Sequence, residues 1–268
     1  MPLLHCRDID VYYERHGVGT TVLSISGSGG DLRQNPALGK GPLERNFDTV
    51  MYDQRGLGQT SIPEGPYKMA DYADDAAALL DGLGIDRCHV VGTSFGGMVA
   101  LELVLRHPER VARLVLACTS SGGGGGSSWD LLELEGLEGE ERMRTWLPKV
   151  DSRNDWSTSP PTVAPGFEGI LSYLENRPQP TGDAARGSRL QLEARLGHDT
   201  WDRLANITVP TFCIGGRFDQ QAPPGNMERL AGRIPGARLA FFDGGHMFMI
   251  QDRAAWPAIV SFLHESAG

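Results

Sequence analysis

The chain of 268 residues has little positive charge, few cysteines and no long apolar run. Its 34 acidic residues outnumber 25 lysines and arginines, which gives a formal net charge of −9. Nucleic acids and anionic membrane surfaces both need clustered basic residues, so we expect neither as a partner. No apolar stretch approaches the length of a membrane-spanning helix, and the first residues lack the features of a signal peptide. The sequence therefore predicts a cytoplasmic protein without a membrane partner.

The cysteines form no metal-binding or redox pattern. The four of them, far apart in the chain, are Cys6, Cys88, Cys118 and Cys213. No His, Asp or Glu cluster has metal-ligand spacing either. The Gly27–Gly30 turn lacks the Lys-Ser/Thr ending of a Walker loop, and Leu32 stands where a dinucleotide fingerprint needs glycine. We therefore expect buried reduced thiols, no metal and no cofactor.

Glycine, in contrast, is abundant, and 35 glycines with 17 prolines imply many tight turns. Residues 1–16 alternate as two short antiparallel strands would, and predicted strands then alternate with predicted helices. The strands are 21–26, 48–53, 88–92, 111–118, 210–214 and 237–242, and the helices are 68–83, 96–106, 225–234 and 252–264. This order is typical of an α/β fold with a mostly parallel, eight-stranded sheet and helices on both faces.

Residues 121–206 interrupt this alternation as an inserted segment. It opens with the glycine tract Gly122–Gly126, which we expect to be a flexible connector. Helix-like pieces follow at 129–147, 167–176 and 184–196, separated by proline-rich breaks. We therefore predict a core domain of residues 1–120 and 207–268, with residues 121–206 as a helical cap inserted in it.

Gly92-Thr93-Ser94-Phe95-Gly96 stands between a predicted buried strand and a predicted helix. Gly-x-Ser-x-Gly at such a junction is typical of a nucleophile elbow, in which a strained turn lifts the serine hydroxyl out of the sheet. Side chains in place of the two glycines would collide with the adjacent strand or helix. The turn would also leave the Phe95 amide at a helix N-terminus, aimed at a developing oxyanion.

Two motifs beside the elbow point to a known family. They are Asp53-Gln54-Arg55-Gly56-Leu57-Gly58-Gln59-Thr60 and Arg106-His107-Pro108-Glu109-Arg110-Val111. With them the chain resembles the α/β-hydrolase superfamily over nearly its whole length, which implies the α/β-hydrolase fold. Gly29-Gly30-Asp31-Leu32 and Glu64-Gly65-Pro66-Tyr67 resemble, more narrowly, the branch of 3-oxoadipate enol-lactonases and small carboxylesterases.

Ser94 needs a base to become nucleophilic, and the base needs an orienting carboxylate. In this fold they follow the serine in the order acid, then histidine. His246, in a glycine loop after a strand, is favoured over His264 in the terminal helix. Asp219, at a strand end, is favoured over Asp243, which is too close to His246. Ser94, Asp219 and His246 are the predicted catalytic residues.

A second oxyanion donor, beside the Phe95 amide, is expected from the turn after strand 21–26. Either the Ser28 or the Gly29 amide could point inward, and we favour Ser28. Many relatives have His-Gly in this turn. Its absence here removes a bracing hydrogen bond but leaves the backbone amide in place.

The substrate pocket is predicted to be apolar. Its candidate residues are Gly29, Trp129, Trp146, Trp156 and Met247, with Phe95 as a further wall. The tryptophans could instead simply fill the cap. An enol-lactone with a free carboxylate would need a cation, for which Arg142, Arg144, Arg186 and Arg189 are candidates.

Together these residues predict a cofactor-free serine hydrolase that cleaves a small-molecule carboxylic ester or lactone. Alternatives on the same catalytic residues are an enol-lactonase-type lactone hydrolase, a carbon–carbon bond hydrolase or a perhydrolase. A non-enzymatic alternative is a binding protein that holds a small ligand on a hydrolase scaffold. No feature of the sequence indicates an oligomeric state.

Overall fold

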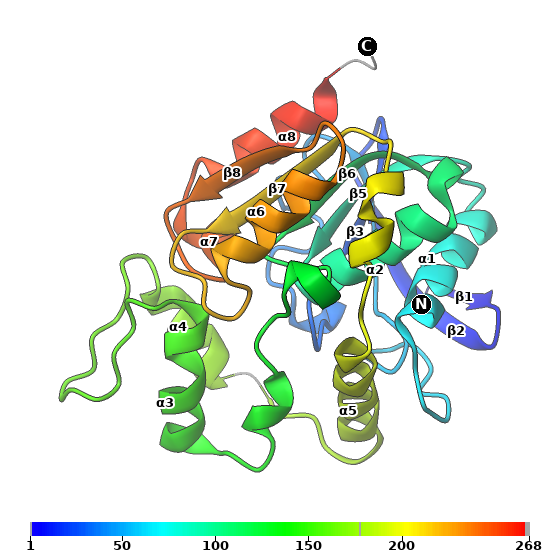
Figure 1. Ribbon diagram of the computed structural model, residues 1–268. Coiled ribbons are helices and arrows are strands. Elements are labelled where there is room, and N and C mark those ends of the chain that lie inside the picture. The colour runs from blue at the N-terminus through cyan, green and yellow to red at the C-terminus, as the bar shows by residue number, and fades with distance from the viewer. Residues whose placement is uncertain (1, 177, 266–268) are drawn as a thin grey trace.

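An eight-stranded sheet organises the computed structural model, which describes residues 2–176 and 178–265 (Figure 1). Its strand order is β1-β2-β4-β3-β5-β6-β7-β8. The strands are β1 Leu3–Cys6, β2 Ile9–His16, β3 Thr21–Ile25, β4 Asp48–Tyr52, β5 Cys88–Thr93, β6 Val111–Ala117, β7 Thr211–Gly216 and β8 Arg238–Phe242. β1 pairs antiparallel with β2 and β2 with β4, and every other pairing is parallel. The predicted mostly parallel sheet is confirmed.

The parallel strands end level with one another. Ile25 pairs with Gly92, and Ala117 pairs with both Thr93 and Ile214. The loops that follow β3, β5, β6 and β7 therefore emerge at the same edge, where ligands bind in open α/β sheets.

Helices cover both faces of the sheet, as predicted. On one face α1 (Met69–Gly82), α2 (Phe95–Arg106) and α6 (Pro224–Arg233) bury their apolar residues in one cluster with the strands. On the other face α8 (Ala255–His264), preceded by the short α7 (Phe248–Gln251), forms a second cluster. Leu101 and Ile259, from opposite faces, are both fully buried. Burying a side chain of this size contributes about 1.5–3 kcal/mol.

Two helix boundaries differ from the prediction, each for a local reason. The last helix begins at Ala255 rather than 252, because Asp252 accepts hydrogen bonds from the amides of Ala254 and Asp243. Residues 129–147 are not one helix. A 3₁₀ turn at Leu131–Leu134 is followed by Gly136 with φ of +77°, and α3 begins only at Gly139.

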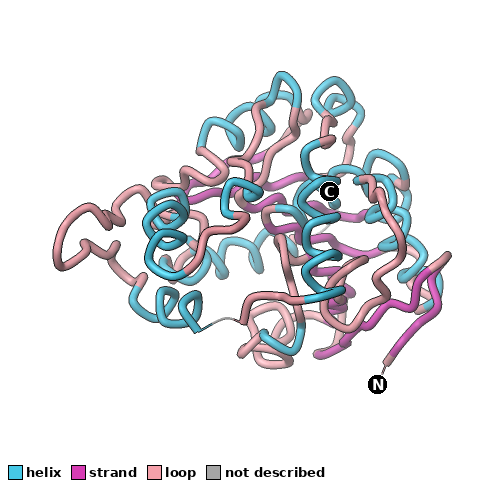
Figure 2. Tube along the Cα trace, turned by 90° about the horizontal axis from the view of Figure 1, so that it is seen from below, coloured by secondary structure: helices cyan, strands magenta, loops and turns pink. Residues whose placement is uncertain are grey.

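The inserted segment, residues 121–206, contains α3 (Gly139–Val150), α4 (Glu168–Asn176) and α5 (Gly182–Leu196), which lie beyond the ends of the parallel strands (Figures 1 and 2). It has an apolar cluster of its own, formed by Leu147, Val150, Trp156, Ala164, Phe167, Ile170 and Leu174. Within the described ranges no helix is long and apolar enough to cross a membrane.

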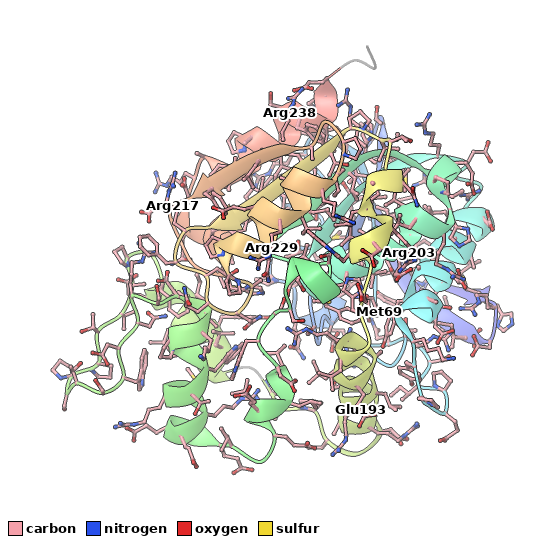
Figure 3. The ribbon with its side chains drawn as sticks, in the orientation of Figure 1. Met69, Glu193, Arg203, Arg217, Arg229 and Arg238 are labelled. Carbon is pink, nitrogen blue, oxygen red and sulfur yellow. The ribbon has the colours of Figure 1, made fainter. Side chains whose placement is uncertain are left out.

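The glycine tract Gly122–Gly126 is packed, and its prediction as a flexible connector is wrong. A Cβ on Gly122 would lie 1.9 Å from the carbonyl oxygen of His198, and one on Gly125 would lie 1.9 Å from Ser121 Oγ. Arg229 of α6, labelled in Figure 3, donates from Nε to the Gly125 carbonyl at 2.8 Å. The tract is rich in glycine because neighbouring atoms leave no room for side chains.

Gly125→Ala should therefore destabilise the fold by about 1–3 kcal/mol, since the new methyl group overlaps Ser121 and the Trp201 ring. Gly169→Ala on α4 is the matched control, because no atom lies within 4 Å of its new Cβ. Urea unfolding followed by circular dichroism measures both. Equal urea midpoints for Gly125→Ala and the wild type would instead support the interpretation of the tract as a flexible connector.

Candidate active site

Ser94 occupies a strained turn between β5 and α2. Its φ is 55° and its ψ is −116°, a conformation that costs an L-residue about 1–3 kcal/mol. Its amide donates to the Ala117 carbonyl at 2.8 Å. A Cβ on Gly96 would lie 2.1 Å from the carbonyl oxygen of Ile25, and one on Gly92 would lie 2.4 Å from that of Gly96. Both glycines are therefore needed for α2 to start so close to β3.

The turn brings Ser94 together with the other two predicted catalytic residues. His246 Nε2 lies 3.0 Å from Ser94 Oγ, and His246 Nδ1 lies 2.8 Å from Asp219 Oδ2. A carboxylate can only accept, so Nδ1 donates its proton to Asp219 and Nε2 accepts the Ser94 hydroxyl. Asp219 is fully buried, and Ser94 and His246 are 8% exposed, so the chain of hydrogen bonds is shielded from most water.

Backbone groups hold the acid and the histidine in place. Asp219 Oδ1 accepts from the amides of Gln221 and Ala222, each at 2.8 Å. The His246 amide donates to the Val150 carbonyl at the end of α3, at 2.6 Å. The alternative acid, Asp243, is instead largely exposed and paired with Arg153.

The turn after β3 is held by α5. The Gly29 amide donates to Gln191 Oε1 at 2.8 Å. This amide is therefore committed to Gln191, which favours the Ser28 amide over it as an oxyanion donor. Gly27 lies directly beside the nucleophile, since a Cβ there would be 3.4 Å from Ser94 Cβ.

Two residues after β4 brace the same turn. Gln54 Nε2 donates to the Ser26 carbonyl at 2.8 Å, and Asp53 Oδ1 accepts from the Leu32 amide at 2.7 Å. These contacts replace the bracing hydrogen bond that the missing His-Gly would supply. Sequence reasoning treated Asp53 and Gln54 as part of a family motif and missed this role, because it depends on a contact between separate loops.

The predicted tryptophans and Met247 lie near the acid loop or against the apolar cluster of the inserted segment, and Trp146 does both. Trp129 and Trp146 contact Gln221, beside the acid loop: the Trp129 amide donates to the Gln221 carbonyl at 2.7 Å and Trp146 Nε1 donates to Gln221 Oε1 at 2.9 Å. Trp156 belongs to the apolar cluster of the inserted segment, against which Met247 packs. For Trp156 the alternative, a residue that fills the segment, is therefore the better description.

The Phe95 ring does not line the site, contrary to its prediction as a pocket wall. It is fully buried and packs edge-on against Tyr72, with ring centres 5.0 Å apart. Because Phe95 is the first residue of α2, its amide has no acceptor within the helix and remains at the positive end of the helix dipole.

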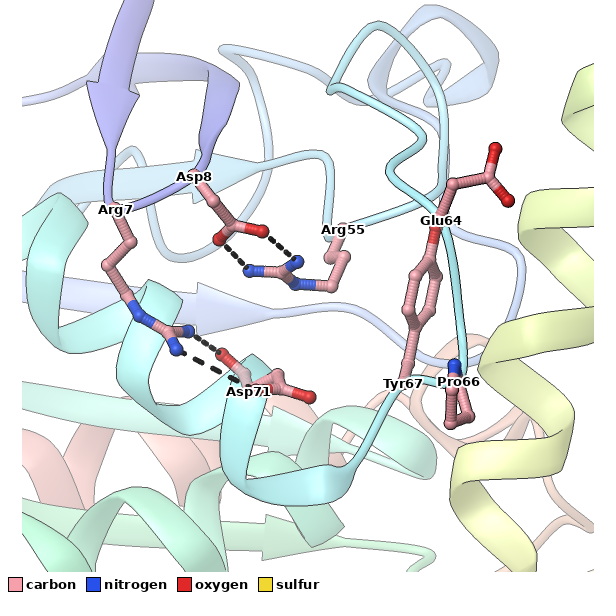
Figure 4. Close-up of a pocket in the computed structure, with 7 residues that line it drawn as sticks. All are labelled: Arg7, Asp8, Arg55, Glu64, Pro66, Tyr67 and Asp71. Carbon is pink, nitrogen blue, oxygen red and sulfur yellow. Dashed lines mark hydrogen bonds and ion pairs between the residues drawn. The ribbon is translucent and has the colours of Figure 1, made fainter.

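A separate polar pocket of about 370 Å³ lies near β1 and is lined by Arg7, Asp8, Arg55, Glu64, Pro66, Tyr67 and Asp71 (Figure 4). Its cations are already paired. Arg55 binds Asp8 and the buried Asp75, and Arg7 binds Asp75 and Asp71. The hydrogen bond from Arg55 lowers the pKa of Asp8 to about 2. This network fixes the loop after β4 rather than offering a free charge to a ligand.

One group of side chains in the described part of the chain has the proximity of a metal site. It comprises Cys118, Asp219 and His246, whose ligand atoms lie within 4.8 Å of one another. Asp219 and His246 are already hydrogen-bonded to each other, and burial raises the pKa of the Cys118 thiol well above its ordinary value. A protonated thiol and an engaged histidine are poor ligands, so these residues do not fit a metal ion. All four cysteines are buried and free.

His198, which the sequence did not single out, is buried where the inserted segment returns to the sheet. Its Nε2 lies 3.1 Å from the Ser120 carbonyl, and its Nδ1 has no partner within the described residues. Burial lowers the pKa of this imidazole from 6.5 to about 4. His198 is therefore neutral at physiological pH.

Acid should destabilise the protein through His198. Below its unfolded pKa of 6.5 the unfolded chain binds the proton while the folded protein does not, so stability falls until the folded pKa of about 4 is reached. This difference corresponds to a loss of about 3 kcal/mol at full protonation. His198→Gln, which keeps a donor for Ser120, should flatten the dependence of the unfolding free energy on pH between these values. Equal slopes for the two proteins would contradict the assignment.

Comparisons with known proteins identify the family of the chain. A family model described as the alpha/beta hydrolase fold matches residues 20–252. A protein of Azorhizobium caulinodans named "Putative carbamate hydrolase RutD" is 30% identical over 92% of each chain. The poly(3-hydroxyalkanoate) depolymerase of Ectopseudomonas oleovorans is 30% identical over 83% of this chain and 77% of its own.

Solved structures resemble the whole chain. The enol-lactonase from Burkholderia xenovorans superposes with a TM-score of 0.76, at 24% identity, over 98% of this chain and 100% of its own. A hydrolase from Pseudomonas aeruginosa superposes with a TM-score of 0.78, at 28% identity, over 98% of both chains.

Proposed function

Because the chain belongs to the α/β-hydrolase family and is a hydrolase, we propose that it is a serine hydrolase that cleaves a carboxylic ester or lactone without a cofactor. One observation carries the proposal. Ser94, raised by a strained strand-to-helix turn, is hydrogen-bonded to His246 at 3.0 Å, and His246 to the buried Asp219 at 2.8 Å. This is the arrangement that makes a serine hydroxyl nucleophilic.

In the first half of the reaction, Ser94 Oγ attacks the substrate carbonyl and His246 Nε2 takes its proton. Asp219 keeps the imidazole in the required tautomer and stabilises the imidazolium that forms. The amides of Gln221 and Ala222 hold the Asp219 carboxylate facing the ring. His246 then returns the proton to the leaving alcohol, which leaves an acyl group on Ser94.

The Phe95 and Ser28 amides would bind the tetrahedral oxyanion. Phe95 supplies a helix N-terminus, and the turn that carries Ser28 is braced on both sides, by Gln54 and by Gln191. Donors held rigidly before the reaction need no reorganisation as charge develops, which is why such sites lower the barrier. In the second half, His246 activates a water that hydrolyses the acyl group.

We assign residues 121–206 as the cap over this site and residues 1–120 and 207–268 as the core. Val150 binds the His246 backbone, Gln191 binds the turn after β3, and Trp146 binds Gln221. The inserted segment thus touches loops on each side of Ser94, as a cover over the nucleophile should.

The names of the relatives are consistent with cleavage of several kinds of chemical bond. One relative is named for carbamates, one for a poly(3-hydroxyalkanoate), which is joined by ester bonds, and one neighbour is an enol-lactonase. A meta-cleavage product hydrolase is also among the structural neighbours. Ester and lactone cleavage remain our first choice, with carbon–carbon bond hydrolysis or perhydrolysis as the alternative. A serine at position 94 disfavours epoxide and haloalkane hydrolysis, which this fold performs with an aspartate there.

Ser94→Ala should abolish burst release of 4-nitrophenol from a 4-nitrophenyl ester, and a fluorophosphonate probe should label Ser94 in the folded wild-type protein. The removal of the nucleophile leaves no group to be acylated. Ser261→Ala, exposed on α8, is the control and should keep both signals. Absent labelling of Ser94 would favour the binding-protein alternative, and unchanged turnover in Ser94→Ala would refute the assignment.

Asp219→Asn should lower kcat by about 10³- to 10⁴-fold, because an amide stabilises the wrong imidazole tautomer. Asp243→Asn is the matched control, since Asp243 is exposed and lies outside the hydrogen-bond chain. Steady-state kinetics on the same ester compares the two. Equal losses would mean that the acid is misassigned.

A further inference from the structure

The inward face of α5 carries two buried polar side chains that the catalytic mechanism does not use. Gln191 is 1% exposed and Arg195 is 7% exposed. They are four residues apart and so lie on one face of the helix. Glu193, labelled on α5 in Figure 3, is exposed on the other side.

The side chain of Gln191 has a hydrogen-bond donor without an acceptor. Its Oε1 accepts the Gly29 amide, while its Nε2 is buried without an acceptor in the described structure. The backbone N–H of Gly29 can only donate, so the side-chain amide of Gln191 must be oriented with Oε1, and not Nε2, toward it. A buried donor without a partner is unfavourable and marks a place where a ligand atom can bind.

The Arg195 guanidinium has no ion-pair partner among the described residues. Its Nη2 donates to the Trp129 carbonyl at 2.7 Å, and no carboxylate of the described residues lies within the 4.0 Å of an ion pair. Asp130 acts on it through space, but the Asp130 carboxylate caps the Leu132 amide. Burial lowers the pKa of Arg195 to about 10, so the guanidinium still carries its charge at neutral pH.

Hydrogen bonds link the two side chains to different loops at the edge of the sheet where Ser94 lies. Gln191 is bound to the turn after β3, and Arg195 is bound to Trp129, whose amide is bound in turn to Gln221 after β7. Ser94 follows β5, which lies between β3 and β7 in the sheet. This face of α5 is therefore linked to loops on both sides of the strand that carries Ser94.

The arginines that the sequence offered as substrate cations are engaged elsewhere. Arg144 is paired with Glu140, and Arg189 with Glu193 and Glu135. Arg186 is paired with Asp183 and Glu64, and Arg142 binds the Leu134 carbonyl and lies over the Trp146 ring.

We propose that the Arg195 guanidinium and Gln191 Nε2 form an anion subsite that binds a carboxylate on the substrate, at a distance from the bond that is cleaved. The proposal rests on the function proposed above, because it places the subsite beside Ser94. A planar guanidinium with free N–H groups matches the geometry of a carboxylate, and the adjacent amide supplies a further donor. The preferred substrate is thus the monoanion of an ester or lactone acid.

The test compares charged and neutral substrates of matched chain length. The charged ones are the mono-4-nitrophenyl esters of succinic, glutaric and adipic acid, and each neutral partner lacks the terminal carboxylate. The wild type should prefer the best anionic ester by about tenfold or more in kcat/KM. Arg195→Met, which keeps the apolar stem of the side chain but removes the guanidinium, should remove that preference, and Arg195→Lys should restore part of it.

Two further variants separate binding from structure. Gln191→Glu keeps an acceptor for the Gly29 amide but places a negative charge beside Arg195, so it should lower the ratio of anionic to neutral kcat/KM. Arg189→Met, on the exposed side of α5, should leave both rates unchanged. If Arg195→Met alters only the melting temperature and leaves the ratio as in the wild type, Arg195 serves only to hold Trp129, and the proposal is wrong.

A binding experiment distinguishes failure of the subsite from failure of the catalytic assignment. Calorimetry of glutarate with Ser94→Ala should show binding that weakens about tenfold or more in Ser94→Ala/Arg195→Met. Equal affinities would overturn the subsite even if esters are hydrolysed. Lost affinity in a protein that hydrolyses no ester would support the subsite and overturn the hydrolase assignment alone.

Discussion

The close approach of α2 to the end of β3 is the constraint on which the active site depends. The Gly96 backbone lies so near the Ile25 carbonyl that a methyl group would overlap it at 2.1 Å. At this contact Ser94 has its strained conformation, and the turn that carries Ser28 lies beside it. The strain is tolerated because the buried sheet on either side fixes both ends of the turn. The stable packing of the core thus holds the strained geometry of the turn.

Around this contact, the loops after β3, β4 and β7 hold one another through side chains rather than through regular structure. Gln54 binds Ser26, Gln191 binds Gly29, and Gln221 binds two tryptophans of the inserted segment. Gln54 donates through its side-chain amide, whereas Gln191 and Gln221 accept through theirs, and none of the three brings a charge into the site. The inserted segment is consequently part of the framework that holds these loops.

The fold and the contact between Ser94, Asp219 and His246 were predictable because they depend on local patterns and on chain order. The alternation of apolar strands and amphipathic helices indicates the sheet, and Gly92–Gly96 marks a turn whose geometry requires glycine. Chain order within the family then leaves few choices for Asp219 and His246.

Gln54, Gln191 and Arg195 were not predictable in the same way. Their importance comes from contacts between segments distant in sequence, and nothing in their own neighbourhoods distinguishes them from surface residues. The glycine tract Gly122–Gly126 was misread for a related reason, because a run of glycines looks the same whether it is loose or tightly enclosed.

The enclosure of that tract also bears on how such a protein could diversify. The Thr200 amide donates to the Ser121 carbonyl at 2.7 Å, so the two ends of the stretch 121–200 lie side by side. The residues between Ser121 and Thr200 therefore form a segment whose two ends are held together. A different helical sequence with the same spacing between its ends could be joined there without altering strand register, provided that it keeps the contacts that Val150, Gln191 and Trp146 make with the loops of the site. One sheet could in this way acquire new substrate preferences by exchange of a cassette, while the reaction chemistry is inherited unchanged.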